Sequence, residues 1–261
     1  MFIFEIVTPG TFLECQDSAA RHRLLTLVSA LKQTFFEANV ALNLFTEEQG
    51  RARQLQANER RQEFANPRRQ IEEDLGAGPR SVLSWEQMEA IRYEAEVIAK
   101  REAWQHGHVP FELEHPRIFI FARSFLYALD QFEKLVAAIC EDPSTPSGLS
   151  AFKERMSQEF PDLREVRNSA HHMEDRVRGL GRNGKPLKLT GIDNEIVSAP
   201  NARVLILNSL IGNRYGSTMA DGSYGEVDVT PESLAKVVAI LEGVLQTFTW
   251  SGPTRHEPSG P

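Results

Sequence analysis

Apolar residues recur at steps of three and four along several stretches of the chain, which is the spacing of an amphipathic α-helix. The longest apolar seam comprises Leu24, Val28, Leu31, Phe35, Ala38, Leu42 and Phe45. The pattern predicts helices over residues 18–45, 84–105, 116–139, 161–178 and 231–249, and a shorter one near 151–159. Helices of this kind bury their apolar faces against one another, so the expected fold class is mainly α.

Capping residues and prolines predict where these helices begin. Thr46, Ser84 and Thr230 have side chains that cap a helix N-terminus, and a glutamine three residues after the first two completes a capping box. We therefore expect a separate, more polar helix after Thr46. Pro116 is expected to open the most apolar helix, because proline is tolerated in the first turn.

The helical pattern is interrupted between residues 187 and 229. Residues 204–207 and 225–229 are short β-type runs separated by Gly- and Asn-rich turns. Residues 1–7 also alternate like a short strand. The prediction is a single domain over residues 1–250, a helical bundle with a small β-hairpin or meander inserted before its last helix. Residues 251–261 are rich in Pro, Gly and Ser and are expected to form a disordered tail.

Composition limits the function classes. The net charge of −7 argues against a protein that coats nucleic acid through bulk electrostatics. The chain has two cysteines, Cys15 and Cys140, and no apolar run of the ~20 residues that a membrane span needs. We expect no membrane association and a cytoplasmic location. The arginines between Arg51 and Arg69 form a local basic strip, either a solvated helix face or a phosphate-contacting surface.

The segment from Arg167 to His172 carries the strongest chemical signal. Its sequence, Arg-Asn-Ser-Ala-His-His, places a permanent planar cation beside side chains whose charge changes near neutral pH. This combination suits metal-free phosphodiester chemistry. At about 100° per residue, Arg167 lies at the edge of the core stripe, His171 about 40° from it and His172 about 140° from it. Helix geometry therefore favours His171 as the partner of Arg167.

The same residues resemble the signature of the HEPN superfamily, in which an arginine and a polar residue precede a histidine on a helix of an α-bundle. Here Arg167, Asn168 and His172 match that spacing. The resemblance extends over about residues 111–180, which would form the HEPN-like core, with the helices at 18–45, 84–105 and 231–249 around it. It implies a metal-independent endoribonuclease whose active site forms where two copies of the motif face each other in a homodimer.

By this resemblance Arg167 would bind the scissile phosphate and Asn168 would orient the phosphate or the histidine. His172 or His171 would act as general acid or base, leaving a 2′,3′-cyclic phosphate. Arg164, Arg182 and Lys185 are candidates for contacts with RNA. The resemblance also suggests a toxin or phage-defence effector, with an antitoxin or other protein as a possible partner.

Other readings stay open. The chain can be a catalytically silent helical module that binds a protein or a nucleotide, or a structural protein whose Arg167 and histidines are ion-paired. The glycines between Gly179 and Gly184 match a dinucleotide-binding spacing, but a helix precedes them where a strand is required, so we expect a turn. The histidines and glutamates between His106 and His115 lie among Gly and Pro, and neither a metal nor another cofactor is expected.

Overall fold

The computed structural model describes residues 1–54, 67–78, 82–193, 198–200 and 203–260. The chain divides into two compact units rather than the single domain expected over residues 1–250. Unit 1 comprises Met1–Glu47 and Ile118–Pro261, and unit 2 comprises Glu48–Arg117. Unit 2 is thus an insertion into unit 1. The chain is mainly helical with a few short antiparallel strands, and no helix of the described residues is both long and apolar enough to cross a membrane.

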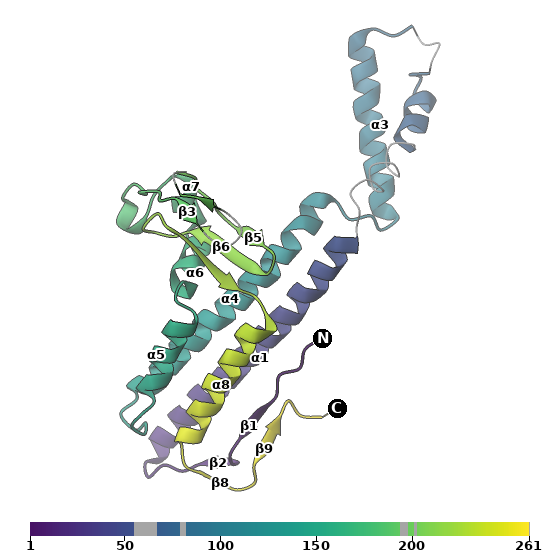
Figure 1. The fold of residues 1–261 in the computed structure, drawn as a ribbon. Coiled ribbons are helices and arrows are strands. Elements are labelled where there is room, and N and C mark those ends of the chain that lie inside the picture. The colour runs from purple at the N-terminus through teal and green to yellow at the C-terminus, as the bar shows by residue number, and fades with distance from the viewer. Residues whose placement is uncertain (55–66, 79–81, 194–197, 201–202, 261) are drawn as a thin grey trace. The chain divides into compact units, whose positions relative to one another are not determined.

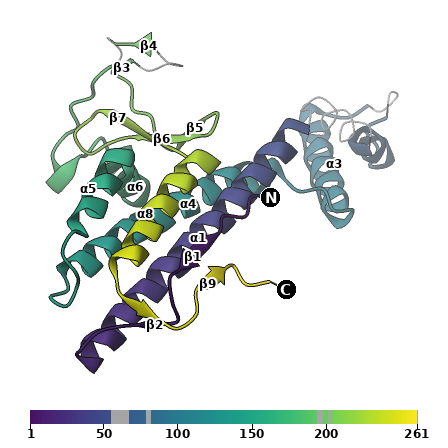
Figure 2. The ribbon, with the colours of Figure 1, turned by 60° about the horizontal axis from the view of Figure 1, so that its bottom comes forward.

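Three long helices form the centre of unit 1. They are α1 (Ser18–Gln54), α4 (Phe111–Glu141) and α8 (Pro231–Thr247), and they run side by side within this unit (Figures 1 and 2). The seam predicted for the first helix is buried along its whole length, from Leu24 to Phe45. It packs with the apolar faces of α4 and α8 into one core. Local periodicity therefore located this core correctly.

Two of the expected helix starts are wrong. Thr46 does not open a new helix, since α1 continues through it to Gln54 and its hydroxyl donates to the carbonyl of Leu42 at 2.8 Å. Pro116 lies inside α4, which already begins at Phe111. A proline near a helix N-terminus removes few backbone hydrogen bonds, so the helix can extend past it. The caps predicted at Ser84 and Thr230 are confirmed.

A three-stranded antiparallel sheet covers one side of α6 (Leu163–His171). Its strands are β5 (Ser209–Ile211), β6 (Arg214–Thr218) and β7 (Tyr224–Asp228). The strand expected at 225–229 is therefore confirmed, but the one expected at 204–207 is wrong. In that segment Ile206 is tied to Thr218 of β6 through its backbone N–H and carbonyl, without forming a ladder. A further pair, β3 (Ile192–Asp193) and β4 (Ser198–Ala199), follows α7 (Met173–Val177) in the chain.

The expected disordered tail is instead paired with the N-terminal segment. β1 (Ile6–Thr8) pairs with β9 (Arg255–Glu257), and β2 (Phe12–Leu13) pairs with β8 (Trp250–Ser251). The carboxylate of Glu257 accepts hydrogen bonds from Thr8 at 2.9 Å and from Lys32 at 2.6 Å. The paired strands supply the backbone partners and apolar contacts that the composition of the tail alone does not reveal.

Unit 2 contains the last turns of α1, helical residues at 67–74, α3 (Trp85–Gln105) and the start of α4. Ion pairs are frequent in this unit. Arg51 pairs with Glu114 at 2.7 Å, and Arg68 pairs with Glu72 at 2.9 Å. At these two positions the basic strip is neutralised by neighbouring acids, as in a solvated, ion-paired surface. Arg60 and Arg61 lie outside the described residues.

Tyr215 of β6 provides a test of the packing under the sheet. Its side chain is fully buried, and its hydroxyl donates to Oδ1 of Asn208. Burial raises the pKa of Tyr215 to about 12 from its usual value near 10. Between these values the unfolded chain loses the phenolic proton while the folded chain keeps it. The free energy of unfolding is therefore expected to fall as the pH rises from 10 to 12.

Tyr215→Phe is expected to reduce this alkaline slope, measured by urea unfolding at pH 7 to 11.5. At pH 7 the substitution should cost about 1 kcal/mol, because Asn208 loses its donor. The exposed Tyr93 supplies the matched control, since Tyr93→Phe should leave both quantities unchanged. Equal slopes for the wild type and Tyr215→Phe would contradict the assigned pKa.

Candidate active site

The motif lies on α6, whose position is set by its apolar face. Leu163, Val166 and Ala170 are buried in the core of unit 1. The N-terminal end of the helix is anchored to the sheet, because Oδ2 of Asp162 accepts a hydrogen bond from the backbone N–H of Glu226 in β7 at 3.2 Å. The helix is thus fixed along one face, and its remaining face carries Arg164, Arg167, Asn168 and His171.

The helix expected over residues 161–178 is broken at His172. α6 ends at His171, and α7 starts at Met173. His172 has φ −100° and ψ 48°, which departs from the helical ψ near −42°. Its backbone N–H still donates to the carbonyl of Asn168 at 2.9 Å. The motif therefore ends at a helix C-terminus.

A buried arginine connects α6 and α7 across this break. Arg176 is 4% exposed; its Nε donates to the hydroxyl of Ser169 at 3.1 Å, and its Nη1 donates to the carbonyl of Leu180 at 2.7 Å. These bonds tie α7 to the body of α6 and to the loop that follows. Sequence reasoning missed this residue, because an arginine in a polar helical stretch is typical of a solvated face.

Arg167 is held by an acid on α4. Its Nη2 donates to Oδ1 of Asp130 at 2.6 Å, and the two side chains are only 16% and 7% exposed. The other oxygen of Asp130 accepts from Lys134 at 2.6 Å. Nε of Arg167 is buried and has no hydrogen-bond partner in the described part of the chain. The guanidinium is therefore fixed at one corner and still has hydrogen-bonding capacity.

Further charges surround this pair. We define the α4–α6 charge cluster as Asp130, Glu133, Lys134, Arg164 and Arg167. Burial is the main cause that raises the pKa of Glu133, and the neighbouring carboxylate of Asp130 adds to it. The three cations of the cluster oppose this rise. The cluster thus holds three cations and two carboxylates, a small excess of positive charge beside α6 in a chain that is acidic as a whole.

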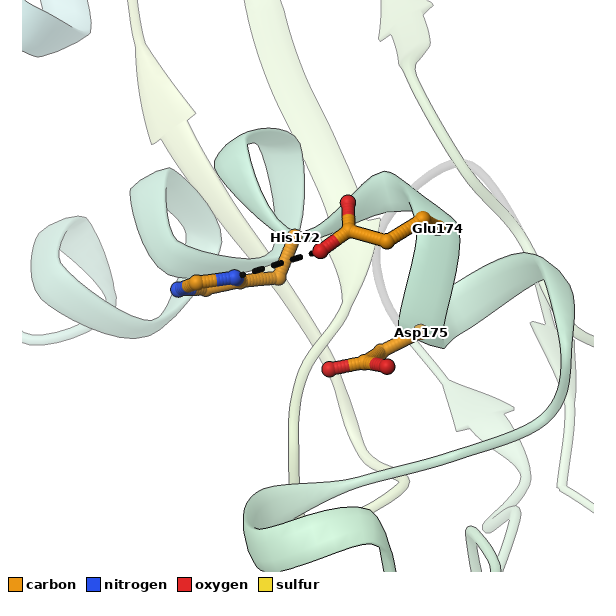
Figure 3. A group of neighbouring side chains, drawn as sticks. All are labelled: His172, Glu174 and Asp175. Carbon is orange, nitrogen blue, oxygen red and sulfur yellow. Dashed lines mark ion pairs between the residues drawn. The ribbon is translucent and has the colours of Figure 1, made fainter.

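The two histidines are exposed and adjacent. Their ring centroids lie 5.0 Å apart with an interplanar angle of 81°, an edge-to-face arrangement. Nδ1 of His172 lies 3.5 Å from Oε1 of Glu174 (Figure 3). Within the described residues, no hydrogen bond or ion pair joins Arg167 to either histidine. Within the described part of one chain, therefore, Arg167 and the two histidines are all present but are not in contact through a hydrogen bond or an ion pair.

The same helix break brings possible metal ligands together. One donor atom each from His172, Glu174 and Asp175 lies within 4.8 Å of the others, all on or beside α7 (Figure 3). A nitrogen and two carboxylates can bind a divalent cation. Asp175 also pairs with Arg178 at 2.5 Å. Cation binding at this position would compete with that ion pair and would occupy His172.

The loop after α7 returns to the motif helix. Arg164, Arg182 and Lys185 are all exposed, and Arg182 pairs with Glu165 of α6 at 2.9 Å. The expectation of a turn at the glycine-rich segment is confirmed, with φ of +71° at Gly179 and +70° at Gly184. Of the three candidates for RNA contacts, Arg182 thus lies beside α6, in an exposed ion pair of the kind that contributes little to stability.

Gly181 in this loop has a steric role that can be measured. A Cβ at this position would lie 2.3 Å from the backbone oxygen of Ala220, although φ −96° suits any residue. Gly181→Ala is expected to lower the free energy of unfolding by about 1–3 kcal/mol, because the backbone must shift. Gly260→Ala is the control, since a Cβ there meets no described atom within 4 Å. Thermal unfolding of both variants decides the point, and equal melting temperatures would contradict the close approach.

Comparisons with known proteins add no relative. No protein-family model, no curated protein and no solved structure matches the chain.

Proposed function

We propose that the protein is a metal-independent endoribonuclease of HEPN type. The observation that carries the proposal is the placement of a partly buried, fixed arginine on the same short helix that ends at two exposed histidines. Arg167 is oriented before substrate arrives, and the imidazoles are accessible to it. Phosphate binding by arginine and proton transfer by histidine are the two operations that RNA cleavage without a metal requires.

In the proposed reaction Arg167 binds the non-bridging oxygens of the scissile phosphate. A histidine, His172 or His171, removes the proton of the ribose 2′-hydroxyl, and the 2′-oxygen forms a bond to phosphorus. The bond from phosphorus to the 5′-oxygen breaks, and that oxygen takes a proton from a second imidazole or from water. The products are a 2′,3′-cyclic phosphate and a 5′-hydroxyl end. DNA is spared, because it has no 2′-hydroxyl.

A homodimer completes this proposal. Since Arg167 and the histidines are not joined within one chain, the arginine of one copy and the histidine of another can act on the same phosphate. Asn168 is half-buried beside them and would orient the phosphate or the histidine. Arg164, Arg182 and Lys185 would contact the flanking RNA backbone. A toxin or defence role, and an antitoxin or other partner, extend the same proposal.

The direct test is incubation of the purified protein with total RNA in EDTA, followed by chemical mapping of the new ends. We expect cleavage, cyclic phosphate ends, no action on DNA of the same length, and a dimer by light scattering. Activity that appears only when Mn²⁺ or Zn²⁺ replaces EDTA would contradict the metal-independent reaction and make His172, Glu174 and Asp175 the first candidates for a metal site. Intact RNA under all conditions would count against the enzyme.

The catalytically silent binding module is the second candidate. The ion pair between Arg167 and Asp130 satisfies much of the charge of the arginine without any substrate, which fits a silent module and equally a structural role for the motif. If this pair is structural only, Arg167→Ala should lower the melting temperature, and the wild type should leave RNA intact.

A further inference from the structure

Asp130 stands out among the charged residues of α4 because it is buried. It lies beside the apolar stripe that includes Phe125, Leu129 and Phe132, and its side chain is 7% exposed. An ionised carboxylate at such a position is costly unless it is paired and hydrogen-bonded. Both oxygens of Asp130 have partners, Arg167 on one and Lys134 on the other. The two partners are unequal, since Lys134 is 57% exposed and Arg167 is 16% exposed.

The geometry of Arg167 follows from this carboxylate. An arginine side chain loses considerable rotamer freedom when it is held in one position. Asp130 supplies a charge-assisted hydrogen bond that holds it. The bond uses Nη2 alone, so the buried carboxylate does not occupy the whole donor set of the guanidinium. An arginine held in this way can bind a phosphate without first being ordered.

We propose that Asp130 is a positioning residue for Arg167, acting through the hydrogen bond from α6 to α4 rather than by touching RNA. The inference rests on the proposed function for its effect on cleavage, but its structural part can be measured separately. The proposal gives α4 a part in the site, the orientation of Arg167, which the residues of the motif on α6 do not provide. The site then consists of an arginine oriented from α4 and a histidine presented by the end of α6.

The activity test compares Asp130→Asn with Glu141→Gln, using the full chain. Asparagine keeps the shape and one acceptor oxygen but loses the charge. Glu141 is the matched control, because it also lies on α4 and pairs with a cation, Lys153, but is 72% exposed. We expect Asp130→Asn to lower kcat/KM for RNA on the order of tenfold to a hundredfold, and Glu141→Gln to leave it within about twofold.

A double-substitution cycle separates positioning from general stability. In an Arg167→Lys background, Asp130→Asn should have little further effect on kcat/KM, because its target has already been changed. If the losses of kcat/KM caused by Asp130→Asn and by Arg167→Lys multiply in full in the double variant, the proposal is overturned. An unchanged kcat/KM in Asp130→Asn would also overturn it. Should Asp130→Asn fail to fold, Asp130→Glu, which keeps the charge and displaces it by one methylene, takes its place with the same expected loss.

A second readout does not depend on activity. The Nε–H of Arg167 is buried, so it should give a slowly exchanging arginine signal in ¹⁵N–¹H NMR spectra, assigned by its absence in Arg167→Lys. We expect this signal to shift and to exchange faster in Asp130→Asn, and to be unchanged in Glu141→Gln. If the wild type does not cleave RNA but the signal responds, the proposed function fails and the positioning role stands. An unresponsive signal overturns the positioning role.

Discussion

His172→Ala is expected to slow RNA cleavage strongly while the protein remains folded. A positioned general acid or base contributes about 10²- to 10⁴-fold to rate, so a loss within that range is expected if His172 carries the proton. Its side chain is 51% exposed and packs little, so its removal should change the melting temperature by less than 1–2 °C. The measurement is single-turnover cleavage of a defined RNA in EDTA, with thermal unfolding of each variant.

The neighbouring histidine decides between the two candidates for this role. A loss confined to His172→Ala would support the spacing of the HEPN resemblance, with the arginine supplied by the other copy of a dimer. A loss confined to His171→Ala would support the pairing expected from helix geometry. His22→Ala provides the control, because His22 is an exposed histidine on α1. Full activity in both motif variants would remove the histidines from the mechanism and with them the proposed reaction.

Deletion of residues 250–261 is expected to destabilise unit 1 strongly. The deletion removes β8 and β9, the backbone partners of the strands that carry the buried Ile6 and Leu13, and removes Trp250, whose indole donates to the carbonyl of Leu245 at 2.7 Å. Each large apolar side chain contributes about 1.5–3 kcal/mol when it is buried. A loss of about 4 kcal/mol or more is therefore expected, which corresponds to a fall of roughly 8–16 °C in melting temperature.

A shorter deletion serves as the control for this result. Removal of residues 258–261 leaves both strand pairs intact and should change the melting temperature by less than 2 °C, as is usual for exposed chain ends. If the longer deletion is equally harmless, the tail does not pair with the N-terminal strands and the disorder expected from its composition is correct.

The elements that could be predicted from the sequence are those whose signals are local. The buried seam of α1 and the caps at Ser84 and Thr230 depend on residues within a few turns of each other, and the structure confirms them. The strands of the C-terminal tail could not be predicted, because their pairing partners lie near the N-terminal end of the sequence. Thr8 and Glu257, which hydrogen-bond, are 249 positions apart.

The residues of the candidate site also differ in whether their signals are local in the sequence. The residues of the motif were found because they are close together in the sequence. The break at His172 was not, and the arginine that bridges it, Arg176, is buried although its sequence context is that of a surface residue. Asp130 carried one weak signal, an acid beside an apolar helical stripe, but its partner on α6 follows 37 positions later. The contacts that orient the site are thus tertiary, and no local pattern encodes them.

The pairing of β1 with β9 has a consequence for synthesis on the ribosome. At about 5–20 residues per second, roughly 12–50 s pass between translation of Thr8 and of its partner Glu257. Unit 2 is a continuous segment and can complete its contacts in that interval, whereas β1 has to wait for its partner strand β9. During that interval the nascent chain presents β1 as an unpaired strand edge, which makes it a natural client for chaperones that bind such segments.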